Sequence, residues 1–162
     1  MIVRDRALAD PLNQTTIRRY CEKDPDMRLL RVHAARGFNP WHTIEGIASL
    51  RGLPNVYFDT SAVTEAGAFE AIVATLGHDR LLYGADFPIS HMRGRCVAIG
   101  DSFHWFSAED MRLEERHATL RPVMVGIESL RSLKLAAWRL KLTDRQIEDT
   151  FCTNAARLYG FA

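Results

Sequence analysis

Three residues that could bind a metal ion or transfer a proton follow short apolar runs in this chain. His33 follows "MRLLRV", Asp59 follows "PNVYF" and Asp86 follows "RLLYGA". Imidazole and carboxylate groups act as general acids and bases and are common ligands of divalent metals. Each residue alone has a simpler explanation, because a strand-end aspartate can cap the next helix and a single histidine is often a structural donor. Three such residues in the same sequence context favour a functional site.

The apolar runs are predicted to be parallel strands, at about residues 28–33, 55–60 and 80–86. Each run is short and bounded by Gly or Pro, as is typical of strands that are covered on both faces. Segments with helical spacing, 10–25, 41–53 and 64–77, alternate with them. This alternation predicts βαβ units and a parallel sheet. Because chemistry collects at the carboxyl ends of parallel strands, we expect the three polar residues to share one edge of the sheet.

The C-terminal part of the chain lacks the strand–helix alternation of the first part. Residues 89 to about 122 are predicted to be a long irregular loop, and loops of that length in a compact domain are usually functional or mobile. A helix is predicted from Met124 to about Leu142, with Trp138 in the core. A second helix opens with a capping box, Thr143 to Gln146.

Composition narrows the possible functions. The chain has 162 residues and 47% hydrophobic residues, enough for one domain with a core. A net charge of +1 gives no global field that would favour nucleic acid or a membrane surface. No apolar stretch approaches the roughly 18 residues of a membrane span, and the charged N-terminus is unlike a signal peptide. The three cysteines, Cys21, Cys96 and Cys152, lack C-x-x-C spacing, which favours reduced thiols and a cytoplasmic protein.

Four segments, "LLRVHAARGF", "NVYFDTSAV", "LLYGADFPIS" and "NAARLYG", resemble the amidohydrolase superfamily. More narrowly, they are similar to its amidohydrolase-related branch of metal-dependent hydrolases and decarboxylases, from Ile2 to Gly160. The resemblance implies a TIM (β/α)8 barrel that holds one or two divalent metals at its C-terminal mouth. Asp86 matches the aspartate that ends the eighth strand, binds metal and takes a proton from metal-bound water. His33 matches the histidine that ends the sixth strand and contacts substrate or a second metal.

The other metal ligands of the family have no counterpart here. They are a His-x-His pair on the first strand and a histidine on the fifth, whereas this sequence has no His-x-His and no histidine before His33. The first residues look like the loop after the fifth strand, which would put Arg4 and Asp5 at that strand's tip. The resemblance therefore predicts a single partial domain, residues 1–162. It corresponds to the C-terminal half of an α/β barrel with C-terminal helices and without the N-terminal half.

Two explanations of this partial barrel are open: a truncated gene model, or a real half-barrel that associates with itself or with an N-terminal half. Exposed strand edges and apolar surface favour association in either case. We expect the chain alone to have little or no catalytic activity. The resemblance implies a divalent metal, most simply zinc, although a His/Asp site also suits manganese or iron.

Four residues near the strand ends are predicted to bind substrate: Arg36, Asp59, His91 and Arg93. Arg36 could bind a carboxylate through two parallel hydrogen bonds, or form a salt bridge within its loop. His91 and Arg93 follow Asp86 in a basic segment that suits an acidic substrate and is also compatible with a solvated loop.

Other residues of the long loop are given structural roles. His104, Trp105 and Phe106 are expected to pack the loop down rather than to line a pocket. Cys96 is disfavoured as a nucleophile, because no base can be paired with it.

The predicted protein is a metal-dependent hydrolase of amide, ester or lactone bonds, or a non-oxidative decarboxylase, that acts on a small carboxylate-bearing molecule. The motif "VYFDTSAV" also resembles that of haloacid-dehalogenase-like phosphatases, but Ser61 stands where they need a second carboxylate. No glycine pattern fits a phosphate-binding loop. The alternative from another class is a non-catalytic half-barrel interaction domain that has lost its metal site.

Overall fold

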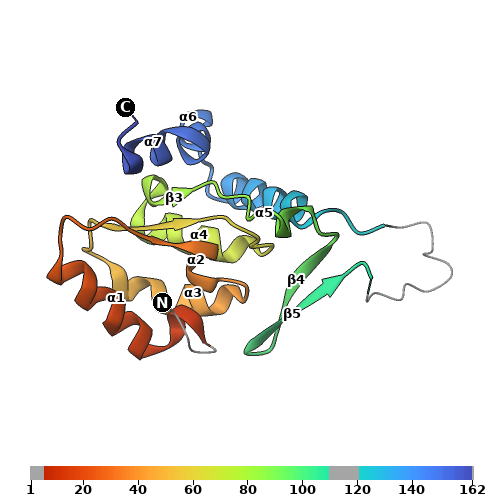
Figure 1. Cartoon of the computed structure of the whole chain (residues 1–162), viewed down its shortest axis with the longest axis horizontal. Coiled ribbons are helices and arrows are strands. Elements are labelled where there is room, and N and C mark those ends of the chain that lie inside the picture. Colours follow the sequence, from red (N-terminus) through yellow and green to blue (C-terminus); the bar gives the residue numbers. More distant parts are fainter. Residues whose placement is uncertain (1–5, 110–120, 162) are drawn as a thin grey trace.

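The computed structural model describes residues 6–109 and 121–161 and contains a three-stranded parallel sheet with helices packed around it (Figure 1). The strands are β1 (Leu29–Arg31), β2 (Val56–Asp59) and β3 (Leu81–Leu82), with β2 in the centre. This arrangement confirms the predicted parallel α/β sheet and fits part of a TIM-barrel-like fold.

The strands are shorter than the predicted 28–33, 55–60 and 80–86. The largest difference is at β3, where the amide of Tyr83 bonds to the carbonyl of Thr150 in the C-terminal segment instead of extending the pairing with β2. After β1 the chain enters a helical turn at Val32, so His33 lies outside the strand.

The helices agree with the predicted segments except at Val32–Arg36, where a short helical turn follows β1 and no helix was expected. They are α1 (Pro11–Lys23), α2 (Val32–Arg36), α3 (Pro40–Gly46), α4 (Ala66–Leu76), α5 (Val125–Arg139), α6 (Asp144–Glu148) and α7 (Asn154–Tyr159). Short helical turns join them: η1 (Ala7–Ala9), η2 (Ile47–Leu50), η3 (His78–Arg80), η4 (Ile89–His91) and the π-helical η6 (Asp149–Thr153). In the region that the structure describes, no helix is both long and apolar enough to cross a lipid bilayer.

Local capping explains where several helices begin and end. The side chains of Asp10 and Asn39 accept hydrogen bonds from the second residue of α1 and α3, and both of these helices start at a proline. The predicted capping box of Thr143 and Gln146 is confirmed at α6. Gly77 ends α4 with a φ of 103°, a conformation that side chains rarely allow.

The core lies between one face of the sheet and its covering helices. Val56, Phe58 and Leu81 on the strands meet Phe69 and Ile72 of α4, and all five side chains are buried. Burial of each of these side chains contributes about 1.5–3 kcal/mol. In Figure 1, α1 and α3 lie below the strands, and α6 and α7 lie above them next to β3.

A second sheet replaces the predicted loop. Gly94–Ile99 (β4) and Ser102–Ser107 (β5) pair as an antiparallel hairpin that extends away from the parallel sheet (Figure 1). The expectation of an irregular segment at 89–122 was wrong here, and part of that segment, 110–120, lies outside the described residues. The Gly100-Asp101 turn between two runs of β-forming residues was the sequence signal for a hairpin.

Trp138 was also wrongly predicted to lie in the core. Its side chain is 76% exposed, whereas Leu133 and Ala136 provide the buried stripe of α5. Two residues correspond to about 200° around a helix, so Trp138 lies on the side opposite Ala136.

Candidate functional site

His33 and Asp86 lie next to each other at the carboxyl edge of the sheet, although they follow its two outer strands. The Nδ1 atom of His33 is 3.8 Å from Oδ2 of Asp86, and both side chains are 28% exposed. The same Nδ1 lies 2.9 Å from the carbonyl oxygen of Ser61. A carbonyl can only accept a hydrogen bond, so Nδ1 carries the proton, and Nε2 carries the lone pair of the neutral ring.

An unusual backbone turn holds His33 in place. His33, Ala34, Ala35 and Arg36 all have φ between 50° and 63°, which makes one left-handed helical turn without glycine. Each such residue costs roughly 1–2 kcal/mol, so tertiary packing must enforce the turn. Ala34 and Ala35 are buried, and the amide of Gly37 closes the turn on the carbonyl of His33 at 2.7 Å. Strain of this kind is concentrated at functional sites.

Asp59 anchors the start of the turn. Its Oδ1 accepts the backbone amide of His33 at 2.7 Å and that of Ser61 at 3.2 Å, and the residue is buried. The carboxylate is therefore engaged by backbone donors between the two candidate residues. These partners differ from the helix cap that was the simpler expectation for Asp59, and Asp59 is not among the residues that line the cavity beside His33 and Asp86.

The segment that carries Asp86 is held against β2. The hydroxyl of Thr60 donates to the carbonyl of Gly84 and accepts from its amide, both at 3.1 Å. A Cβ atom on Gly84 would come within 2.4 Å of Oγ of Ser61 and 3.3 Å of Cβ of Asp59, so a side chain here would displace these two neighbours. Asp86 itself has a φ of 60°, which turns its side chain back toward His33.

A cavity of about 350 Å³ opens beside the pair. This volume is in the range of small-molecule sites. Its walls are mostly apolar, and Arg93 is the one cation among the lining residues of the described structure. The complete lining is His33, Phe38, Asp86, Ile89, Met92, Arg93, Gly94, Trp105, Phe106, Ser107 and Val125.

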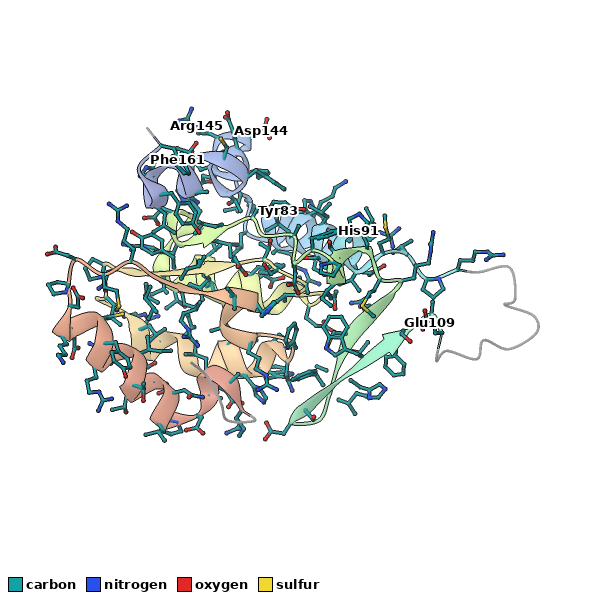
Figure 2. The ribbon with its side chains drawn as sticks, in the orientation of Figure 1. Tyr83, His91, Glu109, Asp144, Arg145 and Phe161 are labelled. Atoms are coloured by element: carbon teal, nitrogen blue, oxygen red, sulfur yellow. The ribbon has the colours of Figure 1, made fainter. Side chains whose placement is uncertain are left out.

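The four predicted substrate-binding residues lie in different places. Arg93 lines the cavity and also donates to the carbonyl of Pro122 at 3.0 Å. Arg36 lies over the ring of Phe103 at 5.7 Å and does not line the cavity. His91 is exposed on the segment between β3 and β4 (Figure 2), where its ring contacts that of Phe87.

Sequence reasoning placed only His33, Asp86 and Arg93 of the cavity lining and missed the others, Trp105 and Phe106 among them. Trp105 and Phe106 line the cavity, where only packing of a loop was expected, and exposed His104 does not. Arg4 and Asp5 lie outside the described residues.

Cys96 is unsuited to nucleophilic chemistry. The thiol is fully buried, and burial, with a smaller contribution from the nearby Glu65 carboxylate, raises its pKa to about 12. Almost none of it is thiolate at neutral pH, in agreement with the low weight given to this residue by the sequence.

The donors present fit a divalent metal in type but not in number. Among residues 6–109 and 121–161, no group of three His, Cys, Asp or Glu side chains could hold an ion. The nitrogen of His33 that is nearest Asp86 is also engaged with Ser61. Asp86 can therefore supply one ligand, and His33 can supply Nε2, but zinc sites with catalytic roles use three protein ligands.

A larger cavity, of about 850 Å³, lies between α5 and the C-terminal helices. Its lining contains no carboxylate, imidazole or thiol among the described residues, so it lacks the side chains that commonly bind a metal. The smaller cavity beside His33 and Asp86 is the candidate site.

No curated protein sequence matches the chain. The sequence model of one family, described as "Amidohydrolase", matches residues 7–161.

Proposed function

Because the chain belongs to the amidohydrolase superfamily, we propose that His33 and Asp86 form the polar centre of a hydrolase or decarboxylase site. The substrate is a small carboxylate-bearing molecule, and the bond broken is an amide, ester or lactone bond, or a bond to a carboxyl group. The observation that carries the proposal is the 3.8 Å approach of the two side chains beside the 350 Å³ cavity.

The residues of this chain have distinct roles in the proposal. Asp86 accepts a proton from the attacking water, as a carboxylate within reach of a reacting group can. His33, with Nδ1–H directed at Ser61, presents Nε2 to the substrate as an acceptor when neutral and as a donor when protonated. Arg93 binds the carboxylate of the substrate by charge-assisted hydrogen bonds.

The cofactor in this proposal is a divalent metal, most simply zinc, with manganese or iron as alternatives. When bound, such an ion lowers the pKa of water and polarises the substrate. Asp86 is the ligand that this chain contributes, and Nε2 of His33 either binds a second metal or contacts the substrate. Since three ligands are needed, the rest of the set comes from a second copy of the chain or from an N-terminal half-barrel.

The apolar cavity of about 850 Å³ between α5 and the C-terminal helices, which is an open groove, supports such an association. Trp138 and Phe151 line it and are 76% and 44% exposed. Exposed apolar patches of this kind mark interaction surfaces. The partner would thus supply the missing metal ligands and would also cover the exposed rings of Trp138 and Phe151. The three cysteines are free thiols, which suits a reducing compartment such as the cytoplasm.

Metal binding tests the proposal directly. The assembled protein, either the self-associated chain or the chain together with its N-terminal half, is titrated with zinc. Its affinity is compared with that of Asp86→Asn and of Asp79→Asn, a control at an exposed ion pair with Arg80. We expect Asp86→Asn to weaken zinc binding at least tenfold and Asp79→Asn to leave it unchanged. Equal affinities for the wild type and Asp86→Asn would overturn the assigned role of Asp86.

The second candidate is a non-catalytic interaction domain. The incomplete donor set and the exposed groove favour it. In that case Asp86→Asn would leave partner association unchanged, and no zinc would be retained by the assembled protein.

A further inference from the structure

The tip of the β4–β5 hairpin is fastened to the start of α3. The amide nitrogen Nδ2 of Asn39 donates to the carbonyls of Gly100 and Ser102, at 3.0 and 2.9 Å. These two carbonyls flank Asp101 at the hairpin turn. Asn39 is completely buried, and its Oδ1 also caps α3. One side chain therefore joins the cap of a helix to a turn about sixty residues later in the chain.

Asp101 attaches the hairpin turn to the body of the protein at a second contact close to Asn39. Its carboxylate lies 3.2 Å from Nε2 of the buried His42 and 2.9 Å from Nε of Arg6. Arg6 also pairs with Glu45 at 2.8 Å. Exposed ion pairs contribute little on their own, but these share one carboxylate with the buried imidazole and act beside the Asn39 hydrogen bonds.

The base of the hairpin is held independently. The hydroxyl of Thr64 donates to the carbonyl of Cys96 at 2.6 Å, and the guanidinium of Arg95 donates to the carbonyl of Thr64 at 3.2 Å. Both ends of the hairpin are thus attached to the body that carries the parallel sheet. The position of the hairpin is fixed by these contacts and not by its own two strands.

Aromatic rings connect this fastened hairpin to the candidate site. The ring of Phe38 lies 5.1 Å from Phe103 and 5.4 Å from Trp105, the second contact being edge to face. Phe38 in turn lies 5.3 Å from the ring of His33. Trp105 and Phe38 both line the cavity, as do Asp86 and Arg93.

We propose that the β4–β5 hairpin is the specificity-determining wall of the candidate site. Trp105 and Phe38 contact a flat apolar group of the substrate, while the carboxylate of the substrate meets Arg93. Asn39 and Asp101 are positioning residues, because they set how closely Trp105 approaches the cavity. This inference rests on the proposed function for the identity of the site. The position of Trp105 and the preference for a flat group can nevertheless be tested without metal or turnover.

The first measurement asks whether Asn39 positions Trp105. Trp41 and Trp138 are exposed, so Trp41→Phe and Trp138→Phe leave Trp105 as the only tryptophan at little structural cost. Quenching of its fluorescence by acrylamide then reports its accessibility. Asn39→Ser keeps a helix-capping oxygen but loses the reach to the hairpin carbonyls.

The matched control is Asn55→Ser. Asn55 is also buried and also donates from Nδ2 to two backbone carbonyls, those of Cys21 and Asp24, far along the chain from the hairpin. We expect the quenching constant of Trp105 to rise about twofold or more in Asn39→Ser and to stay unchanged in Asn55→Ser. Equal quenching in both variants would show that Asn39 does not position Trp105.

The second measurement asks whether the wall recognises a flat group. The probes are benzoate and cyclohexanecarboxylate, which share charge and ring size but differ in planarity, with binding measured by calorimetry. Aromatic contacts contribute enough that we expect benzoate to bind about fivefold more tightly. Trp105→Ala and Asn39→Ser are expected to remove that preference, and Asn55→Ser to keep it.

Equal affinities for the two probes in the wild type, or a preference that survives Trp105→Ala, would overturn the inference. A benzoate preference that depends on Trp105, found together with a failed zinc test, would refute the proposed function and leave the hairpin wall intact. The probe-binding result therefore tests the role of the hairpin separately from the zinc result, which tests the metal assignment.

Discussion

The carboxylate of Asp59 holds the backbone amide of His33 at 2.7 Å, and that bond fixes the first residue of a left-handed turn. The same oxygen also accepts the amide of Ser61, whose carbonyl receives Nδ1–H of His33. Asp59 thus controls both the backbone and the ring of His33. It acts on the candidate site through another residue and not through the cavity.

Replacement of Asp59 tests this role. Asp59→Ala leaves two amides without their acceptor and should lower the free energy of unfolding by about 2–3 kcal/mol, since unpaired buried groups cost about 1–3 kcal/mol each. Asp59→Asn keeps an accepting oxygen and should lose about 1 kcal/mol. Urea denaturation measures both. An equal loss in the two variants would mean that the negative charge, and not hydrogen-bond acceptance, is what matters.

Lys141 is predicted to be replaceable by glycine with a gain in stability. It follows α5 with a φ of 54°, and two amides, those of Lys141 and Leu142, bond back to the carbonyls of Trp138 and Ala137. This is the Schellman arrangement, in which glycine is the usual residue at the left-handed position. Lys141→Gly should therefore raise the free energy of unfolding by about 1 kcal/mol.

The control for this prediction lies within the same helix. Lys134 is exposed in the interior of α5, where glycine is unfavourable. Lys134→Gly should lower the free energy of unfolding by about 1 kcal/mol. Changes of the same sign at both positions would contradict the assigned geometry.

The hairpin fastening is predicted to weaken in acid. Hydrogen bonds from Arg6 and then from His42 hold the pKa of Asp101 below its usual range. A lowered pKa means that the contact stabilises the folded hairpin above the ordinary aspartate pKa of about 4, and that this contribution is lost as pH falls through the lower folded value. Glu45, which faces Arg6, is the other acid in the cluster.

Accessibility of Trp105 measures this transition. Acrylamide quenching of the protein with Trp105 as its only tryptophan should rise as the pH is lowered below about 4. Asp101→Asn should show increased quenching already at neutral pH and little further change. A wild-type protein whose quenching is flat down to the pH of global unfolding would rule out the acid-sensitive fastening.

Thiol labelling should distinguish the three cysteines. Burial raises the pKa of Cys21 and takes that of Cys96 to about 12, whereas Cys152 is exposed. Because the thiolate is the reactive species, iodoacetamide at pH 8 should label Cys152 in the native chain and leave the other two unmodified. Peptide mass spectrometry identifies the labelled sites, and denaturation in urea should expose all three. Rapid native labelling of Cys96 would mean that the hairpin opens.

Much of the body of this protein could be predicted from the sequence. Helical spacing, the Gly77 end signal and the Thr143 capping box are local features, and they located the helices correctly apart from α2. The order of the strands and the gathering of His33 and Asp86 at one edge follow from alternation and from the geometry of parallel sheets. Helix caps and hydrophobic spacing depend on residues that are close together in the sequence, and the order of the elements follows directly from them.

Other features needed the tertiary structure. No residue in the run from His33 to Arg36 signals a left-handed turn, because its cost is met by Asp59 and by packing from elsewhere in the chain. The helical pattern of α5 is compatible with Trp138 on either side, and only the contacts of Leu133 and Ala136 decide which face is buried.

The sequence by itself determined the helices, the parallel order of the strands and the two residues at the centre of the candidate site. Tertiary structure decided that Asp59 supports the site from behind, that Arg93 reaches the cavity and that a hairpin brings Trp105 to its wall. The physical reason is range. Caps and periodicity depend on neighbours within about one helical turn, whereas these side chains are positioned by partners tens of residues away in the chain.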